Sequence, residues 1–368
     1  MDRRIVTGVL VGALAPAFVL THTAVDRYRN RRLNLAAEWS ARGTADLPAH
    51  PETAVTDFET ALAFGPDRTS DRFFLAKALI ASNRHGEANA QLETLLVDEP
   101  AKGEINLELA RLAAAATDVT AAIRYYDAAI DGTWDANGTE SRRQVRLEFA
   151  RWLAAHGQPG LAQAQLIALA DDLPPDPVQM TSVAELLADT GATGRALSLL
   201  RKALELSPSN SAASALAGEI EFRNGNVRAA RADLAAAASH GALDDRAKDA
   251  LDVSERVLAL DPYASGIGSR SRLDRIRRAF MTAEARMNRC ESAPSGSPVR
   301  ARIDALTPRV SEIAKQEARG ADRDPDFMDT AMAVVFDVER LPSDACGGDT
   351  ADDRALALLA NQRTSSPQ

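Results

Sequence analysis

Along the middle of the chain, each segment of about 34 residues contains two stretches in which apolar residues recur at helical spacing. The stretch FFLAKALIASNRHGEANAQLETLL, residues 73–96, is an example: two amphipathic runs flank a break that contains Gly86. Apolar positions three and four residues apart form one face of a helix. The pattern therefore predicts pairs of amphipathic helices joined by short turns.

Small residues repeat in step with this pattern, at steps of 34, 40, 34 and 34 positions. Three columns keep these steps: Ala88, Ala122, Ala162, Ala196 and Ala230; Ala76, Ala110, Ala150, Ala184 and Gly218; and Leu95, Ala129, Leu169, Ala203 and Ala237. Prolines, which cannot continue a helix, open most of the repeats: Pro66, Pro100, Pro174 and Pro208. A period of this length predicts a stack of repeats, running about 66–99, 100–133, 134–173, 174–207 and 208–241.

This pattern resembles the tetratricopeptide repeat family, whose 34-residue unit is a helix, a turn and a second helix. The family's small residue after a large apolar one is matched by Leu75-Ala76, Leu109-Ala110, Phe149-Ala150 and Val183-Ala184, and less well by Ala217-Gly218. The resemblance covers about residues 31–262. It implies an all-α, right-handed superhelical solenoid that binds a protein or peptide and has no catalytic residues.

The ends of the array and its third repeat depart from the pattern. A degenerate repeat is expected at Leu33–Ala41 and Glu52–Phe64, and a solvating cap helix at Asp245–Leu260. The third repeat has six extra residues near Asp131–Ser141 and holds Trp134 where the family's proline would stand. We expect a longer loop there, within an unbroken stack.

The first thirty residues form a separate region. Ile5–Thr21 is an uncharged, mostly apolar run of 17 residues between Arg3-Arg4 and an arginine cluster at 27–32. It is just long enough for a single membrane-spanning helix, so residues 1–30 are predicted to be an anchor; a cleaved signal peptide is the alternative. The arginine cluster favours a body in the cytoplasm, whereas the cysteines favour a body outside it.

Residues 263–368 carry no repeat. Helices are expected at Ser269–Arg289, Val299–Ala318, Phe327–Val338 and Asp352–Asn361, and Arg363–Gln368 are expected to be disordered. The first of these helices is strongly basic. It could lie on anionic lipid headgroups, pack against the acidic end of the array, or cover apolar surface with its arginine stems.

Two cysteines, Cys290 and Cys346, occur in this region, and neither belongs to a CxxC pair. In an oxidising compartment they could form a disulfide that closes an interval of 56 residues and stabilises the fold by about 4 kcal/mol. Two free thiols in a cytoplasmic protein are the alternative. We favour the disulfide, and with it a body in the periplasm of a bacterium.

The resemblance also implies a binding groove, because the family's first helices line the concave side and contact ligands there. The position after the small residue reads Lys77, Arg111, Arg151, Glu185 and Glu219; the position three residues further on reads Ile80, Ala114, Ala154, Ala188 and Phe222. A peptide with acidic residues near one end could lie along this row. Solvated surface charges are the alternative. No asparagine occupies these positions, so the family's carboxylate-clamp binding is not expected.

Charge and motifs exclude several other functions. The net charge of -9 argues against nucleic-acid binding, and the chain has no HExxH, GxSxG or P-loop motif. Carboxylates at Asp322, Asp324, Asp326 and Asp329 resemble the start of a calcium loop, but a helix N-cap at Asp326 explains them better. No metal site, cofactor or small-molecule substrate is predicted.

The sequence thus favours a non-enzymatic scaffold on the inner membrane of a bacterium, attached by one N-terminal helix and binding a protein or peptide. Two alternatives remain open: an enzyme or metal-binding subunit with its site in residues 263–368, and a membrane-anchored scaffold that faces the cytoplasm.

Overall fold

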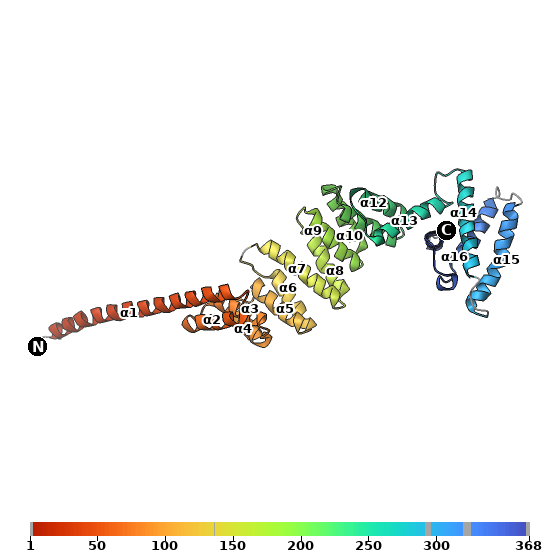
Figure 1. Cartoon of the computed structure of the whole chain (residues 1–368). Coiled ribbons are helices and arrows are strands. Elements are labelled where there is room, and N and C mark those ends of the chain that lie inside the picture. The colour runs from red at the N-terminus through yellow and green to blue at the C-terminus, as the bar shows by residue number, and fades with distance from the viewer. Residues whose placement is uncertain (1–2, 136, 291–295, 319–324, 366–368) are drawn as a thin grey trace. The chain divides into compact units, whose positions relative to one another are not determined.

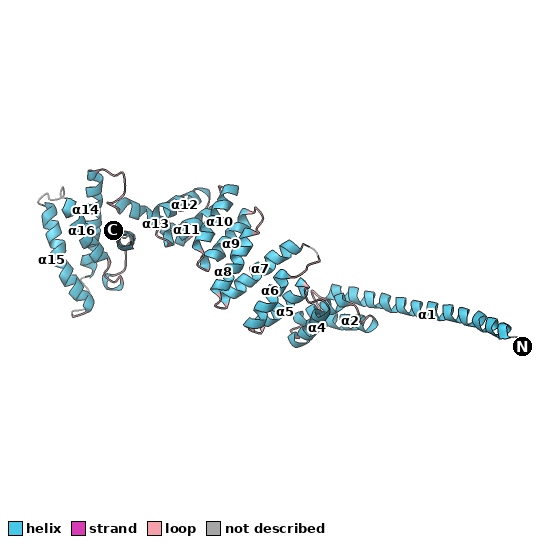
Figure 2. Ribbon diagram, turned by 180° about the vertical axis from the view of Figure 1, so that it is seen from behind, coloured by secondary structure: helices cyan, strands magenta, loops and turns pink. Residues whose placement is uncertain are grey.

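The computed structural model describes residues 3–135, 137–290, 296–318 and 325–365, and the side chains of most residues before Thr21 lie outside this description. The described residues form helices joined by turns and loops, with one isolated β-bridge (Figures 1 and 2). They divide into an N-terminal body, Met1–Gln165, and a C-terminal body, Leu166–Gln368. The division falls inside α8, Pro159–Asp171.

The N-terminal body is built from helix hairpins. Its helices are α1 (Arg3–Asp46), α2 (Pro51–Phe64), α3 (Thr69–Ala81), α4 (His85–Asp98), α5 (Gly103–Ala115), α6 (Val119–Asp131) and α7 (Gly138–Ala155). The predicted small-residue columns lie in its core, where Ala76, Ala88, Ala110 and Ala122 are 0% exposed. Small side chains at these positions let paired helices pack closely. The predicted helix pairs are confirmed, including the degenerate first one, α1 and α2.

Helix α1 runs without a break from the predicted anchor into the first hairpin. None of the helices among the described residues is both long and apolar enough to cross a membrane, so the structure gives no support to a transmembrane helix at 5–21. Most side chains of that segment are outside the described residues, and the anchor remains a prediction.

The extra residues of the third repeat lengthen a helix as well as a loop. Helix α7 has 18 residues, whereas α3 and α5 have 13 each. The preceding loop is tied to the turn before α5: Gly103 N donates to Thr133 O (2.8 Å), and Thr133 N donates to Ala101 O (2.7 Å). Trp134 packs on Gly103, where a Cβ atom would overlap the indole ring. The longer loop is confirmed, and Trp134 fixes its position.

The C-terminal body continues with hairpins and ends in a helical tail. Its helices are α9 (Pro177–Asp189), α10 (Thr193–Leu206), α11 (Ser211–Arg223), α12 (Val227–His240), α13 (Asp245–Leu260), α14 (Ser269–Cys290), α15 (Pro298–Ala318), α16 (Pro325–Glu339), the short 3₁₀ helix η2 (Asp344–Cys346) and α17 (Ala351–Ser365). All four predicted tail helices are present. Their bounds agree with the prediction to within a few residues.

Gly218 is the one glycine in a column of alanines, and packing explains it. A Cβ atom at Gly218 would lie 2.5 Å from Leu234 Cγ and 3.0 Å from the Leu234 backbone nitrogen. Helices α11 and α12 therefore approach more closely than a methyl group permits. The weaker match of this repeat to the family pattern reflects that close approach.

Helix α13 was expected to be a solvating cap, and this prediction is wrong, because α17 returns to cover it. Val253, Val257 and Leu260 share one buried core with Leu356 and Leu359 of α17. Salt bridges Asp249–Arg354 (2.7 Å) and Arg256–Asp352 (2.8 Å) flank this core. The apolar face of α13 is thus buried against the last helix.

The chain end is also more ordered than the sequence predicts. Helix α17 continues to Ser365, and the Arg363 guanidinium lies 3.5 Å from the centroid of the Tyr263 ring. This cation–π contact places Arg363 in the folded body, which corrects the prediction of disorder from that residue. Residues 366–368 lie outside the described part of the chain.

The basic helix α14 packs into the body. Arg275 Nη1 donates to Asp261 O (2.8 Å) and Leu258 O (3.0 Å), and so binds the last carbonyl groups of α13. Arg277 Nε donates to Glu317 of α15 (3.0 Å). These contacts favour the two packing interpretations of α14 over the lipid one.

Candidate interaction site

The basic residues of the predicted groove lie on α3, α5 and α7, but they differ in their partners. Arg111 binds Glu148 of α7 through two hydrogen bonds, Nε to Oε1 (2.9 Å) and Nη2 to Oε2 (2.8 Å), and also pairs with Glu108 (3.1 Å). The Tyr126 hydroxyl donates to Glu148 as well (3.0 Å). Arg111 is therefore held between α5 and α7.

The environment of Glu148 supports this structural role. Burial alone would raise its pKa, but the hydrogen bond and charge of Arg111, with the Tyr126 hydroxyl, hold the pKa below its usual value. Burial also raises the pKa of Tyr126, as does the neighbouring Glu148 carboxylate. The three side chains form a stable, partly buried network.

Lys77 and Arg151 have no ion pair among the residues that the structure describes. The half-buried Lys77 places Nζ 5.9 Å from the centroid of the Phe73 ring, and Arg151 is exposed on α7. Ile80, also half-buried, packs partly against the core of α2–α5. Two positive charges and partly exposed apolar surface thus remain on the first helices of this body.

A hollow of about 360 Å³ opens at the amino-terminal ends of α3 and α5. Phe73, Phe74 and Ile105 line it, together with Lys102 and Asp135, which form an ion pair. The inserted loop before α7 supplies Asp135. The predicted groove residue Lys77 and the hollow are therefore neighbours through Phe73.

The acidic residues of the predicted row belong to the C-terminal body. Glu185 is exposed on α9. The side chain of Glu219 is only 15% exposed, and Arg246 Nε lies 3.3 Å from it; burial raises the pKa of Glu219, with Arg246 opposing the shift. Phe222 packs partly against two buried cores of this body. A continuous row through all the predicted positions stays a prediction.

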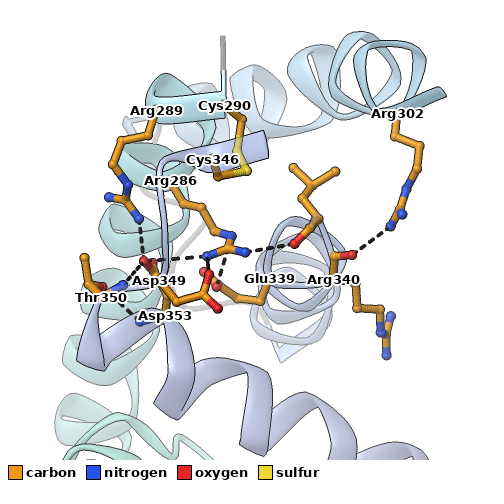
Figure 3. Close-up of a disulfide and its surroundings, with 11 residues drawn as sticks. Arg286, Arg289, Cys290, Arg302, Glu339, Arg340, Cys346, Asp349, Thr350 and Asp353 are labelled. Carbon is orange, nitrogen blue, oxygen red and sulfur yellow. Dashed lines mark hydrogen bonds and ion pairs between the residues drawn. A yellow bond between two sulfur atoms is a disulfide. The ribbon is translucent and has the colours of Figure 1, made fainter. Parts of the chain in front are cut away.

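The predicted disulfide is present. Cys290, the last residue of α14, is bonded to Cys346 of η2, and both residues are 0% exposed (Figure 3). The bridge links the end of α14 to the turn that precedes α17. It fixes the start of the segment that covers α13.

A buried charge cluster lies beside the disulfide, and the sequence analysis did not predict it (Figure 3). The members are Arg286 and Arg289 of α14, Glu339 of α16, Asp349, and Asp353 of α17. Arg286 is 2% exposed; Nη1 pairs with Asp349, and Nη2 donates to Leu341 O (2.8 Å). Arg289 pairs with Asp353. The spacing of Arg286, Arg289 and Cys290 on one helix was the only sequence signal.

Glu339 is the least satisfied member of this cluster. Its side chain is 0% exposed, and no described residue donates a hydrogen bond to either carboxyl oxygen. Arg286 Nε is 3.5 Å from Oε2. Burial, and then the charge of Asp353, raise the pKa of Glu339 to about 8 against the opposing charge of Arg286.

The described residues contain no group of three or more His, Cys, Asp or Glu side chains placed to hold a metal ion. Helix α16 begins at Pro325, so Asp326 is its second residue rather than its N-cap, and its carboxylate lies in the first turn, where it complements the helix dipole. Asp329 accepts a hydrogen bond from the Tyr263 hydroxyl (3.4 Å). Asp322 and Asp324 are outside the described residues.

No protein-family model matches the sequence, and neither does any curated protein. Similar solved structures include the C-terminal part of a TPR repeat-containing protein from Cytophaga hutchinsonii, which is 14% identical over 62% of this chain and 92% of that chain (TM-score 0.48). YrrB, a TPR protein with an unusual peptide-binding site, is 19% identical over 50% and 88% (TM-score 0.34). PilW, a type IV pilus biogenesis factor, is 20% identical over 61% and 98% (TM-score 0.36).

The fold rests on the helices of the chain itself. Helix hairpins recur at a 34-residue step, with one step of 40, and the small-residue columns at Ala76, Ala88 and their repeats are buried where the helices pack. The chain therefore folds as an array of helix hairpins, the fold that its resemblance to the tetratricopeptide repeat implies.

Proposed function

We propose that this protein is a non-enzymatic scaffold that binds an acidic segment of a protein partner on the first helices of its N-terminal body. The observation that carries the proposal is that the positive charges of Lys77 and Arg151 are available to a partner. Both are positively charged, neither has an ion pair among the described residues, and partly exposed apolar side chains accompany them. A partner with carboxylates next to apolar residues would complement this face.

We also propose that the folded bodies work outside the cytoplasm, at the bacterial cell envelope, held to the inner membrane by residues 5–21. The disulfide supports the compartment, because disulfides persist in oxidising environments and are rare in the cytosol. The apolar run at 5–21 supports the anchor.

The binding proposal predicts that the double variant Lys77→Glu/Arg151→Glu loses its ligands. Arg111 is left intact because its pairing with Glu148 holds α5 to α7. In selection from a random peptide-display library, we expect wild type to enrich peptides that combine Asp or Glu with apolar residues. The double variant should bind the enriched peptides at least about tenfold more weakly, since loss of two charge contacts of about 1 kcal/mol each exceeds 1.4 kcal/mol.

The matched control is Arg124→Glu/Arg142→Glu, which reverses the same number of charges in the same body. Arg142 is nine residues before Arg151 on α7 and so lies on the opposite face of that helix. The control should bind the peptides as wild type does. Equal binding by wild type and the Lys77/Arg151 variant, with both folded by circular dichroism, would contradict the proposed site.

The compartment is tested by fractionating intact cells after thiol trapping. We expect the protein in the membrane fraction, with Cys290 and Cys346 recovered as one cross-linked peptide pair under non-reducing mass analysis. Two alkylated thiols would instead favour the body in the cytoplasm, and recovery in the soluble fraction would contradict the anchor.

A further inference from the structure

The charge cluster beside the disulfide holds more carboxyl groups than guanidinium groups. Glu339, Asp349 and Asp353 supply three carboxyl groups, whereas Arg286 and Arg289 supply two guanidinium groups. The side chains of Glu339 and Asp353 are both 0% exposed. The side chain of Asp349 is 31% exposed and can be solvated. An unmatched charge on a fully buried carboxyl group, however, is costly, so the charges of the cluster balance when one of its two buried carboxyl groups is neutral.

Hydrogen bonding identifies Glu339 as that group. Asp353 Oδ2 accepts a hydrogen bond from Thr350 N (2.7 Å) and pairs with Arg289, while Asp349 pairs with Arg286. Neither oxygen of Glu339 has a donor among the described residues. Arg286 Nη1 and Arg289 Nη2 are therefore directed at the other two carboxylates, and Arg286 Nη2 at Leu341 O.

The charges that act on Glu339 come from three segments. Helix α14 contributes Arg286 and Arg289, the segment after η2 contributes Asp349, and α17 contributes Asp353. On the α15 side of α16 the one carboxylate, Asp337, pairs with both Arg309 of α15 (2.7 Å) and Arg340 (3.0 Å), so these pairs add no excess negative charge. Burial is the main cause of the raised pKa of Glu339, and the negative charge of Asp353 adds to it.

Among the charged groups, the Asp353 carboxylate has the largest effect on the pKa of Glu339, and Asp353 belongs to α17, the helix that covers α13. Asp353 lies in the first turn of α17, and two glycines with left-handed backbone, Gly347 (φ 73°) and Gly348 (φ 93°), separate α17 from Cys346. The disulfide fixes Cys346, so the glycines provide the point about which α17 could turn.

We propose that this cluster is a pH-dependent clasp on the end of the repeat array. With Glu339 protonated, α17 stays packed on α13. Once Glu339 ionises, repulsion drives Asp353 and the first turn of α17 away, and the apolar face of α13 formed by Val253, Val257 and Leu260 becomes accessible. The Cys290–Cys346 bond holds the start of the released segment at the end of α14.

The direction of the pH effect follows from linkage. The pKa of Glu339 in the packed state lies above its usual value, so the packed state holds the proton more tightly than the open state. The stability that this proton gives the packed state is complete below the pKa of the open state. It is lost as the pH rises through the pKa of the packed state, near 8.

Hydrogen–deuterium exchange of the full-length protein tests the clasp. Protection of the amides of residues 351–365, corrected for intrinsic exchange, is compared at about pH 6 and about pH 9. In wild type the protection factors should be at least about tenfold lower at pH 9 than at pH 6, because a pKa difference of one unit between the packed and open states changes their equilibrium by a factor of ten. Glu339→Gln, which stays neutral, should retain its protection at both pH values.

Glu312→Gln is the matched control, since it removes an exposed carboxylate from neighbouring α15; it should lose protection as wild type does. Asp353→Asn is a second variant, for use if Glu339→Gln does not fold. It removes the repelled charge from α17, and its protection should also persist at high pH. Protection that is independent of pH in wild type, or lost equally in both folded variants, overturns the proposal.

Discussion

Replacing Arg286 by methionine should destabilise the C-terminal body by about 3–5 kcal/mol, the usual cost of removing one partner from a buried ion cluster. Methionine has a similar length, so the change removes charge and hydrogen bonds with little loss of packing. Asp349 would lose its partner, Leu341 O its donor, and Glu339 its nearest positive charge.

The measurement can separate the two bodies, because all three tryptophans, Trp39, Trp134 and Trp152, lie in the N-terminal body. In urea, the midpoint of the tryptophan fluorescence transition should be the same in Arg286→Met as in wild type. Part of the helical circular dichroism signal of the variant should be lost at a lower urea concentration than in wild type. Arg278→Met is the control on the exposed side of α14. If Arg286→Met and Arg278→Met unfold at the same urea concentration, the cluster does not stabilise this body.

Loss of the disulfide should have the next largest effect. In Cys290→Ala/Cys346→Ala, removal of a bond that spans 56 residues should cost about 2–4 kcal/mol, because the unfolded chain regains the entropy of an open loop. Exchange protection measured near pH 6 should fall most in α14, η2 and α17. Reduced and alkylated wild type should behave like the variant, and an unchanged unfolding midpoint in both would show that the bond contributes no stability.

The helices of this protein could be predicted from its sequence because their signals are local. Asp245–Leu260 follows Asp244, whose side chain accepts a hydrogen bond from Ala247 N (2.7 Å) and caps the helix. The repeat columns identify the packing faces in the same way. The pairing of the two cysteines could also be predicted, since the chain has no other cysteine with which either could pair.

The charge cluster and the cover over α13 depend instead on contacts between distant residues. Arg286 is 63 residues from Asp349, and Asp249 is 105 residues from Arg354. In the sequence Arg286 is one arginine among several on a basic helix, with nothing to mark it as buried.

The groove was predicted only in part for a similar reason. A periodic alignment gives Lys77, Arg111 and Arg151 the same position, but it does not show that Glu148 is placed to bind Arg111 (2.8 Å). Side-chain pairing between adjacent repeats thus decides which of the aligned charges remain available to a partner.

The unbroken course of α1 has a mechanical consequence. A helix of 44 residues is about 66 Å long, and its carboxyl-terminal part is also the first member of the first hairpin. The helix is unbroken between the two. If the amino-terminal end is held in a membrane, as proposed, a rotation or tilt of that end is passed along α1 to the first hairpin. Helix α1 would then set the orientation of the first hairpin relative to the membrane.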